Sequence, residues 1–285
     1  MVTLENWAER LGEDMRLRDF SERTQGGYAL AVKLFLRWAD TEPDQLEEAQ
    51  IRAYVLYLRQ KGQAPSSINI AVCALRFFVT YTLQRDWGVF DLLRVKHPSK
   101  LPVVLSTTEV RSVLASIRHP VRRVALTTIY ALGLRLGEGL RLQTEHIDSD
   151  RMIVSVRNGK GAKDRSVPLP RPLLGRLRQY WKVERPKVPG AYLFVAGRGD
   201  APLHETTLQK TFMVAQQEVL PNKHATIHTL RHSYATHLIE HGISVRTIQA
   251  LMGHKSMRTT EVYLHVTRPG TERLQDVLDR LMANL

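Results

Sequence analysis

Hydrophobic residues recur every three or four positions through the first part of the chain, up to about residue 90. That spacing is typical of helices with one buried face, and it predicts four helices, over 6–19, 24–38, 45–60 and 68–83. The fourth segment is apolar around most of its circumference, so we expect it to form the buried centre of a bundle. Cys73 lies inside that segment and is predicted to be a small core residue.

A break in the pattern follows the fourth helix. Between Arg94 and Pro102 there are two prolines, three Lys or Arg residues and no periodicity. A residue that precedes proline prefers an extended backbone, so we interpret 94–105 as a linker. A chain of 285 residues is long enough for about two domains, and the linker separates a domain over 1–93 from a second one over 106–285.

The second domain mixes helical and strand patterns. Its segments predict a helix over 106–117, an apolar helix over 121–132, strands around 153–156 and 167–169, a helix over 173–183 and further helices from 206. Ser106 and Glu109 have the spacing of a capping box at the first of these helices. The predicted fold class is mainly α with a small antiparallel sheet, divided into an all-α four-helix bundle and an α+β C-terminal domain.

Positive charge is concentrated after residue 50. Residues 1–50 carry 11 acidic and 6 basic side chains, residues 51–100 carry 2 and 8, and residues 101–285 carry 15 and 27, for a net charge of +13. Such a field attracts polyanions, and nucleic acid is the favoured one because neutralised phosphates release counterions. A basic surface without a specific partner is the alternative. A membrane surface is disfavoured, since no segment combines a basic face with a strongly apolar one.

Other features limit where the protein acts. No uninterrupted run of about 18 apolar residues occurs, which argues against a transmembrane span. The N-terminus has acidic residues and no apolar stretch, so we expect no secretory signal. The single cysteine cannot form an internal disulfide and offers no metal-ligand cluster. A cytoplasmic, nucleoid-associated location is the expectation.

Charged residues interrupt four segments of the second domain that otherwise look buried. In the first, Arg135 and Glu138 follow an apolar helix. Either an ion pair between them or a phosphate site at Arg135 explains that pattern. In the second, Lys160 lies in a Gly-Lys-Gly turn between two strands, where it would present its ammonium group at the tip of a hairpin. A solvated basic hairpin is the alternative, and the spacing is not that of a P-loop.

The other two segments carry histidines. His228 and Arg231 share a helix face, with His232 beside them. Histidine next to arginine suits a polyanion better than a metal ion, although solvated side chains at a capped helix start would look the same. Further along, a Gly-His pair ends at His254, nine residues before Tyr263. From its position alone, Tyr263 would be an amphipathic core or interface residue.

Together and in this order, the four segments are highly specific: the chain resembles the tyrosine site-specific recombinases of the phage integrase family. The resemblance covers the whole second domain, and the N-terminal bundle is similar to the SAM-like core-site-binding domain of that family. Length and compactness are nearest to the Xer-type and transposon-borne members. Gly137 stands where the family often has Ser and Met252 where it often has Leu, and neither departure removes a catalytic group.

The resemblance implies that Tyr263 attacks a DNA strand and forms a 3′-phosphotyrosyl bond, which stores the energy needed for rejoining without ATP. Arg135 and Arg231 would bind the non-bridging phosphate oxygens, where charge develops. His228 would accept the phenol proton, and His254 would donate a hydrogen bond to the phosphate.

The four further residues are a catalytic lysine, a supporting carboxylate and two DNA contacts. The resemblance implies that Lys160 protonates the departing 5′-oxygen as general acid and that Glu138 orients the catalytic arginine. Lys163 and Arg165 are predicted, as neighbours of that lysine, to contact DNA phosphates. Neither a metal ion nor a cofactor is expected, because guanidinium groups supply the positive charge that divalent ions supply in other phosphoryl-transfer sites.

The last segment, about 271–285, is predicted to be a helix with one apolar stripe, formed by Leu274, Val277, Leu278, Leu281 and Met282. The resemblance implies an exchange helix that docks into a neighbouring protomer of a homotetramer, on two duplexes that carry recombination sites. A hetero-oligomer or accessory proteins are further possible partners. A helix packed on its own domain is the alternative.

Two other activities could use parts of the same chemistry. A type IB topoisomerase shares the Arg, Lys, His and Tyr residues, and a non-catalytic accessory protein could use the same fold to bind DNA. The two-domain plan and the segment ahead of Tyr263 favour a recombinase over the first. The complete set of catalytic residues favours it over the second.

Overall fold

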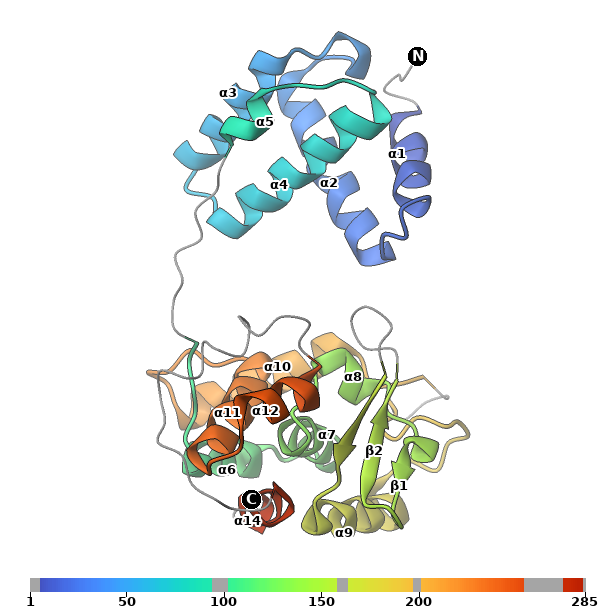
Figure 1. Cartoon of the computed structure of the whole chain (residues 1–285), viewed down its shortest axis with the longest axis vertical. Coiled ribbons are helices and arrows are strands. Elements are labelled where there is room, and N and C mark those ends of the chain that lie inside the picture. Colours follow the sequence, from blue (N-terminus) through green and yellow to red (C-terminus); the bar gives the residue numbers. More distant parts are fainter. Residues whose placement is uncertain (1–5, 94–101, 158–163, 197–200, 254–273, 284–285) are drawn as a thin grey trace. The chain divides into compact units, whose positions relative to one another are not determined.

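The computed structural model describes residues 6–93, 102–157, 164–196, 201–253 and 274–283. The chain forms two compact units, Met1–Lys100 and Leu101–Leu285, and each has a hydrophobic core of its own. Figure 1 shows the first unit as an assembly of helices and the second as helices beside a small sheet. In the described ranges, no helix is long and apolar enough to cross a membrane.

The first unit contains the four helices that the periodicity predicts and a short fifth one. They are α1 (Trp7–Arg16), α2 (Glu22–Ala39), α3 (Glu48–Gln60), α4 (Pro65–Phe77), which a π-helical turn (Phe78–Thr82) extends, and α5 (Val89–Leu92), with a 3₁₀ turn at Pro43–Gln45. Aromatic rings fill much of the core. Trp7 meets Phe78 edge-on with ring centroids 6.0 Å apart, and Phe35 meets Tyr54 at 5.1 Å.

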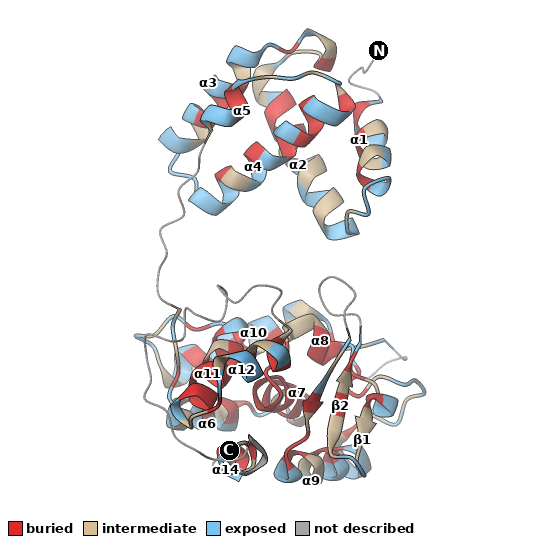
Figure 2. Cartoon of the chain, in the orientation of Figure 1, coloured by how far each residue is buried: buried red, intermediate tan, exposed pale blue. Residues whose placement is uncertain are grey.

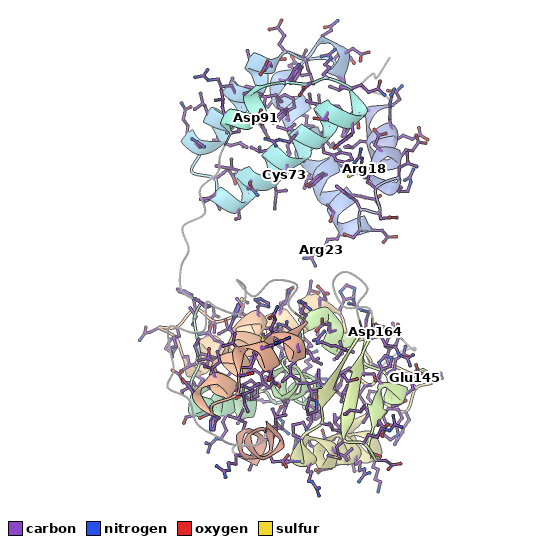
Figure 3. All side chains as sticks on the ribbon, viewed as in Figure 1. Arg18, Arg23, Cys73, Asp91, Glu145 and Asp164 are labelled. Carbon is purple, nitrogen blue, oxygen red and sulfur yellow. The ribbon has the colours of Figure 1, made fainter. Side chains whose placement is uncertain are left out.

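Helix α4 is less completely buried than its composition predicts. Val72 and Leu75 lie in the core, whereas Cys73 is exposed and Ile70 is 51% exposed. The prediction that Cys73 is a core residue is therefore wrong (Figure 3). The reason is helical geometry: Cys73 lies three residues after Ile70, so the two share the outward face of a helix whose other face is buried.

The second unit is mainly helical with one small antiparallel sheet, as predicted. Its helices are α6 (Thr107–Ser116), α7 (Pro120–Ala131), α8 (Leu136–Leu140), α9 (Arg171–Gln179), α10 (Glu205–Val219), α11 (Ile227–Glu240), α12 (Val245–Met252) and α14 (Leu274–Ala283), with a 3₁₀ turn at Thr144–His146 and a π-helical turn at Tyr180–Glu184. The predicted capping box starts α6, since Ser106 Oγ accepts the Glu109 N–H at 3.2 Å and the Glu109 carboxylate accepts the Ser106 N–H at 2.8 Å.

The sheet consists of β1 (Ile147–Asp148), β2 (Ile153–Val156) and β3 (Arg165–Pro168), in the order β1-β2-β3. Strands β2 and β3 are antiparallel, with Val154 opposite Val167 and Val156 opposite Arg165. Both β2 valines and Val167 are buried, so this face of the hairpin points into the core. Side chains alternate along a strand, and Arg165 therefore lies on the inward face two residues before Val167.

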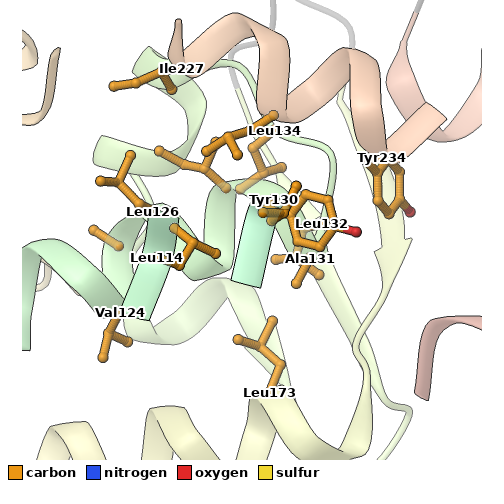
Figure 4. Packing of buried hydrophobic residues seen from close by; sticks show 14 of the residues in the cluster. Leu114, Val124, Leu126, Tyr130, Ala131, Leu132, Leu134, Leu173, Ile227 and Tyr234 are labelled. Carbon is orange, nitrogen blue, oxygen red and sulfur yellow. The ribbon is translucent and has the colours of Figure 1, made fainter. Parts of the chain in front are cut away.

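Helix α7 forms the centre of the second core. Every residue from Val124 to Ala131 is buried, and in Figure 2 this helix is almost entirely in the colour of buried residues. Helices α6, α9, α10 and α11 all contact it, and Figure 4 shows Leu114, Ile227 and Tyr234 among the side chains gathered around it. The chain turns sharply just after α7 at Gly133, whose φ is 59° and whose Cβ, if it had one, would overlap the ring of Tyr234.

The C-terminal helix α14 packs on its own unit. It contacts α9 and α7, and Leu278, Leu281 and Met282 are buried in the same core. The Arg171 N–H at the start of α9 donates to the Asp279 carboxylate at 3.0 Å. These contacts correspond to the self-packed arrangement that the sequence leaves open beside exchange into a neighbour.

A buried hydrogen bond joins the two central helices α7 and α11. Tyr130 Oη lies 2.9 Å from His237 Nδ1, and both side chains are buried. Burial, the largest effect, lowers the pKa of His237 to about 4. The ring is therefore neutral in the folded protein, while in the unfolded chain it titrates near its usual 6.5.

We predict that acid destabilises the α7–α11 pair through His237. As the pH falls, the unfolded chain binds a proton at this histidine near pH 6.5, whereas the folded protein binds it only near pH 4. The free energy of unfolding therefore keeps its full value above pH 6.5 and decreases as the pH falls from 6.5 to about 4. From pH 7.5 to 5 the loss should be about 2 kcal/mol. Hydrogen exchange of α7 and α11 peptides, corrected for intrinsic rates, measures it.

The substitution His237→Gln should reduce the pH dependence, and His224→Gln, at an exposed histidine of the same unit, is its matched control. An unchanged dependence in His237→Gln would show that this ring is not the group responsible.

Candidate active site

The structure describes five of the nine residues that the sequence assigns to catalysis or DNA contact. Arg135 and Glu138 lie at the start of α8, Arg165 starts β3, and His228 and Arg231 lie in the first turns of α11. Lys160, Lys163, His254 and Tyr263 lie outside the described residues.

At the start of helix α8, Arg135 donates two hydrogen bonds to the carboxylate of Glu138. Glu138 Oε2 accepts the backbone N–H of Arg135 at 2.8 Å, and Glu138 Oε1 accepts from Arg135 Nη1 at 2.7 Å. The ion pair that the sequence allows is thus present. It uses one edge of the guanidinium, and the other edge donates from Nη2 to the Gly253 carbonyl at 3.3 Å. The Arg135 side chain is 28% exposed, so it remains within reach of a ligand.

Arg165 has a different environment from the one predicted. Its side chain is 9% exposed, and its two terminal nitrogens donate to the two oxygens of Glu138 at 3.0 and 2.8 Å. The third nitrogen, Nε, donates to the Leu251 carbonyl at 2.7 Å. All three nitrogens of this guanidinium donate to groups of the protein itself. The alternation along β3 was the sequence signal that could have placed Arg165 on the inward face, although it does not identify the partner.

Arg231 is the most deeply buried arginine of the site. It projects from α11 with 1% of its side chain exposed, and it donates to the carbonyls of Gly133 and Met252. Its Nη1 also lies 3.8 Å from Glu138 Oε2. An arginine this deeply buried is costly unless its donors have partners. These contacts fix Arg231 near the same carboxylate that Arg135 contacts.

Glu138 is ionised throughout the physiological range. Its side chain is 2% exposed, and this burial alone would raise its pKa. Hydrogen bonds from Arg165 and from the backbone and side chain of Arg135, together with the charge of Arg165, outweigh burial and lower the pKa of Glu138 to about 2. Three arginines around one carboxylate leave a surplus of two positive charges, which suits a phosphodiester that gains charge in its transition state.

His228 lies close enough to this cluster for its ring to be influenced by the charges of Arg231 and Arg135. It is exposed, and its ring meets that of His232 edge-on with centroids 4.5 Å apart. Desolvation and then the positive charges of Arg231 and Arg135 lower the pKa of His228. The same kinds of effect, burial first and His228 next, lower the pKa of His232 to about 4. Both rings are therefore neutral at pH 7, as a proton acceptor must be.

Metal ligands are not grouped in the part of the chain that the structure describes: no three His, Cys, Asp or Glu side chains lie together there in a way that could hold an ion. The positive charge in the described part of the site comes from guanidinium groups.

Comparison with known proteins identifies the arrangement. The sequence pattern of the phage integrase family matches residues 104–269, and that of the phage integrase N-terminal SAM-like domain matches residues 7–89. The chain belongs to the phage integrase family. Its two units thus correspond to the two parts that the sequence predicts, a SAM-like helical domain and a catalytic domain.

Individual relatives are recombinases and integrases. The chain is 44% identical over 260 residues to a putative integrase/recombinase, y4qK, of Sinorhizobium fredii, covering 90% of this chain and 83% of the relative. It is 32% identical to the tyrosine recombinase XerA of Thermococcus kodakarensis, covering 90% of both chains. The structure of a lambda integrase tetramer bound to a Holliday junction superposes with a TM-score of 0.71 at 19% identity, over 90% of this chain and 78% of that one. This last likeness concerns the fold.

The family membership and the enzyme class expected from the sequence are confirmed: the chain is a tyrosine recombinase, and neither a topoisomerase nor an accessory protein is favoured by these relatives.

We predict that Glu138→Gln destabilises the DNA-free protein by about 3 kcal/mol, because it leaves buried guanidiniums without their shared counter-charge. Glu145→Gln is the matched control: Glu145 pairs with Arg157 at 3.0 Å on the surface, and its loss should change the free energy of unfolding by less than about 0.5 kcal/mol. Urea unfolding followed by circular dichroism measures both. Equal effects of the two substitutions would contradict a central role of Glu138 in the charge balance.

Proposed function

We propose that this recombinase cleaves and rejoins DNA at specific sites through a bond between Tyr263 and a 3′-phosphate. One observation supports the proposal above the others. Two arginines predicted to bind phosphate, Arg135 from α8 and Arg231 from α11, converge on the single carboxylate of Glu138, although 96 residues separate them in the chain. Such convergence creates a localised positive potential where a scissile phosphate could lie.

The guanidinium groups suit the transition state of this reaction. As the phenol oxygen attacks phosphorus, negative charge grows on the non-bridging oxygens, and planar donors held in advance stabilise it without having to reorganise. Arg231 is fixed by buried contacts, and Arg135 is the more exposed of the two. We assign the non-bridging oxygens to these two residues.

Proton transfer requires an acceptor for the phenol and a donor for the leaving oxygen. We assign the first role to His228, whose lowered pKa keeps the ring neutral at pH 7 and which is exposed beside Arg135 and Arg231. Lys160 is proposed as the donor that protonates the 5′-oxygen, because it lies in the sequence between β2 and β3, and β3 begins at Arg165, which contacts Glu138. His254, which follows the end of α12, is proposed to donate a hydrogen bond to the phosphate.

The whole assembly is also part of the proposal. A homotetramer on two duplexes that carry recombination sites would bring four active sites together. The first unit and Lys163 would contribute to DNA binding. Since α14 packs on its own unit through Leu278, Leu281 and Met282, exchange into a neighbour would require the helix to leave the surface of α7 and α9. A cytoplasmic, nucleoid-associated location follows from the DNA substrate.

We predict that Tyr263→Phe removes covalent attachment to DNA while leaving DNA binding within about twofold, because only the nucleophilic oxygen is lost. The assay incubates protein with a nicked suicide duplex, whose sequence is recovered by sequencing DNA trapped on the wild type, and detects adducts on denaturing gels. Tyr192→Phe, at a half-buried tyrosine of the same unit, is the control and should form adducts at the wild-type rate. An adduct in Tyr263→Phe would reassign the nucleophile.

We predict that Lys160→Ala slows cleavage by about 10²- to 10⁴-fold, the usual contribution of a general acid. A substrate with sulfur in place of the leaving 5′-oxygen should restore the rate, because a thiolate departs without protonation. Single-turnover cleavage of the two substrates by wild type and variant gives the comparison. Equal slowing on both would assign Lys160 a role other than proton donation.

A further inference from the structure

Three arginines hold the end of α12 by its backbone. Arg165 donates to the carbonyl of Leu251, Arg231 to that of Met252 and Arg135 to that of Gly253. We call these three hydrogen bonds, to three consecutive carbonyls, the α12 clamp. The last carbonyls of a helix lack partners within the helix and carry its negative partial charge, so guanidinium groups are favourable partners for them.

The same three side chains surround Glu138, but they do so unequally. Arg165 forms a two-pronged pair with the carboxylate, at 3.0 and 2.8 Å. Arg135 uses one nitrogen at 2.7 Å, and Arg231 lies 3.8 Å away. Among the described residues, Arg165 thus makes two of the three side-chain hydrogen bonds to Glu138, and it has the geometry that fits a carboxylate best.

Close packing at Gly253 ties Arg165 to α12 a second time. Gly253 ends the helix with a φ of 61°, a conformation that glycine adopts readily. A Cβ at this position would lie 3.2 Å from Arg165 Cδ and 3.4 Å from its Nη1. The helix end therefore rests against the arginine side chain.

We infer that Arg165 is a positioning residue of the recombinase, which holds Glu138 and the end of α12 in place and does not contact DNA. The inference rests on the proposed function and concerns residues on both sides of Arg165. In the sequence, Lys160 precedes β3, which Arg165 starts, and His254 comes directly after the helix end that Arg165 holds. One guanidinium thereby joins the start of β3 to the end of α12.

Arg165 also affects the two phosphate-binding arginines through Glu138. While Arg165 occupies both carboxylate oxygens, Arg135 needs only one nitrogen to pair with Glu138. Without Arg165, the buried carboxylate would lack two donors, and its attraction would draw Arg135 and Arg231 away from a phosphate. A loss of Arg165 should consequently reduce the rate of the chemical step, with DNA affinity unchanged.

The experiment separates positioning from phosphate contact. Arg165→Gln and Arg165→Lys are made in the full chain, with Arg157→Gln and Arg157→Lys as matched controls at a surface arginine that pairs with Glu145. Two quantities are measured: the cleavage rate at saturating protein on a suicide duplex recovered from wild-type adducts, and the salt dependence of binding to a 30-base-pair duplex of random sequence. The duplex length is about three helical turns.

For a positioning residue, Arg165→Gln should lower the saturated cleavage rate by about 10- to 100-fold, the usual effect of losing a supporting partner. The dissociation constant should stay within twofold and the salt slope should not change. Arg165→Lys keeps the charge and loses the two-pronged geometry, so it should remain at least about tenfold slow. Both Arg157 variants should cleave within threefold of wild type.

The opposite result would overturn the inference. A phosphate contact would weaken binding, lower the salt slope by about 0.9 and leave the saturated rate within threefold of wild type. Unchanged rate and binding would equally reject positioning. If wild type itself forms no adduct, the proposed function fails instead, so the two failures are distinguishable.

A double variant tests the route through Glu138. If Arg165 acts through this carboxylate, Arg165→Gln combined with Glu138→Gln should be no slower than the slower single variant. Multiplied effects would show that Arg165 acts independently. Each cleavage rate is divided by the fraction of protein that forms adducts, so that inactive protein does not count. If Arg165→Gln does not fold, Arg165→Lys, which keeps the charge, replaces it.

Discussion

The catalytic unit depends on a carboxylate that is almost completely removed from water. An isolated charge in that position would be prohibitively costly, and Glu138 is stable as an anion only because Arg135 and Arg165 donate to it and Arg231 lies nearby. These partners come from α8, β3 and α11. The charge balance is therefore complete only when sheet and helices have assembled, which ties formation of the site to formation of the fold.

The same arrangement explains how three positive charges can lie close together in the folded unit. The three guanidinium groups, so close together, would repel each other. The negatively polarised carbonyls at the end of α12 and the carboxylate of Glu138 lie among them and offset that repulsion. Arg135 is the partner with most exposure and the longest bond to a carbonyl, 3.3 Å to Gly253. Of the three arginines, Arg135 is therefore the one whose donors are most accessible from solvent.

Local sequence signals predicted most of the fold. The capping box at Ser106, the apolar helix α7 and the change of period at the sheet each depend on neighbours within a few residues, and all three form. Cys73 shows the limit of such signals, because a uniformly apolar segment does not say which of its faces is covered. The ion pair of Arg135 and Glu138 could also be predicted from the sequence, because the two residues lie three positions apart at the start of one helix.

Contacts across the chain could not be predicted in this way, and arginines show why. Composition assigns every arginine equally to a positive field, yet Arg165 donates to a carboxylate 27 residues away. Arg185 is used likewise: it is buried and donates to the carbonyls of Pro186, Val188, Gly190 and Tyr192. Both hold backbone or carboxylate groups that would otherwise lack partners. Part of the excess of +13 is thus structural, and the number of basic residues overestimates how many can face DNA.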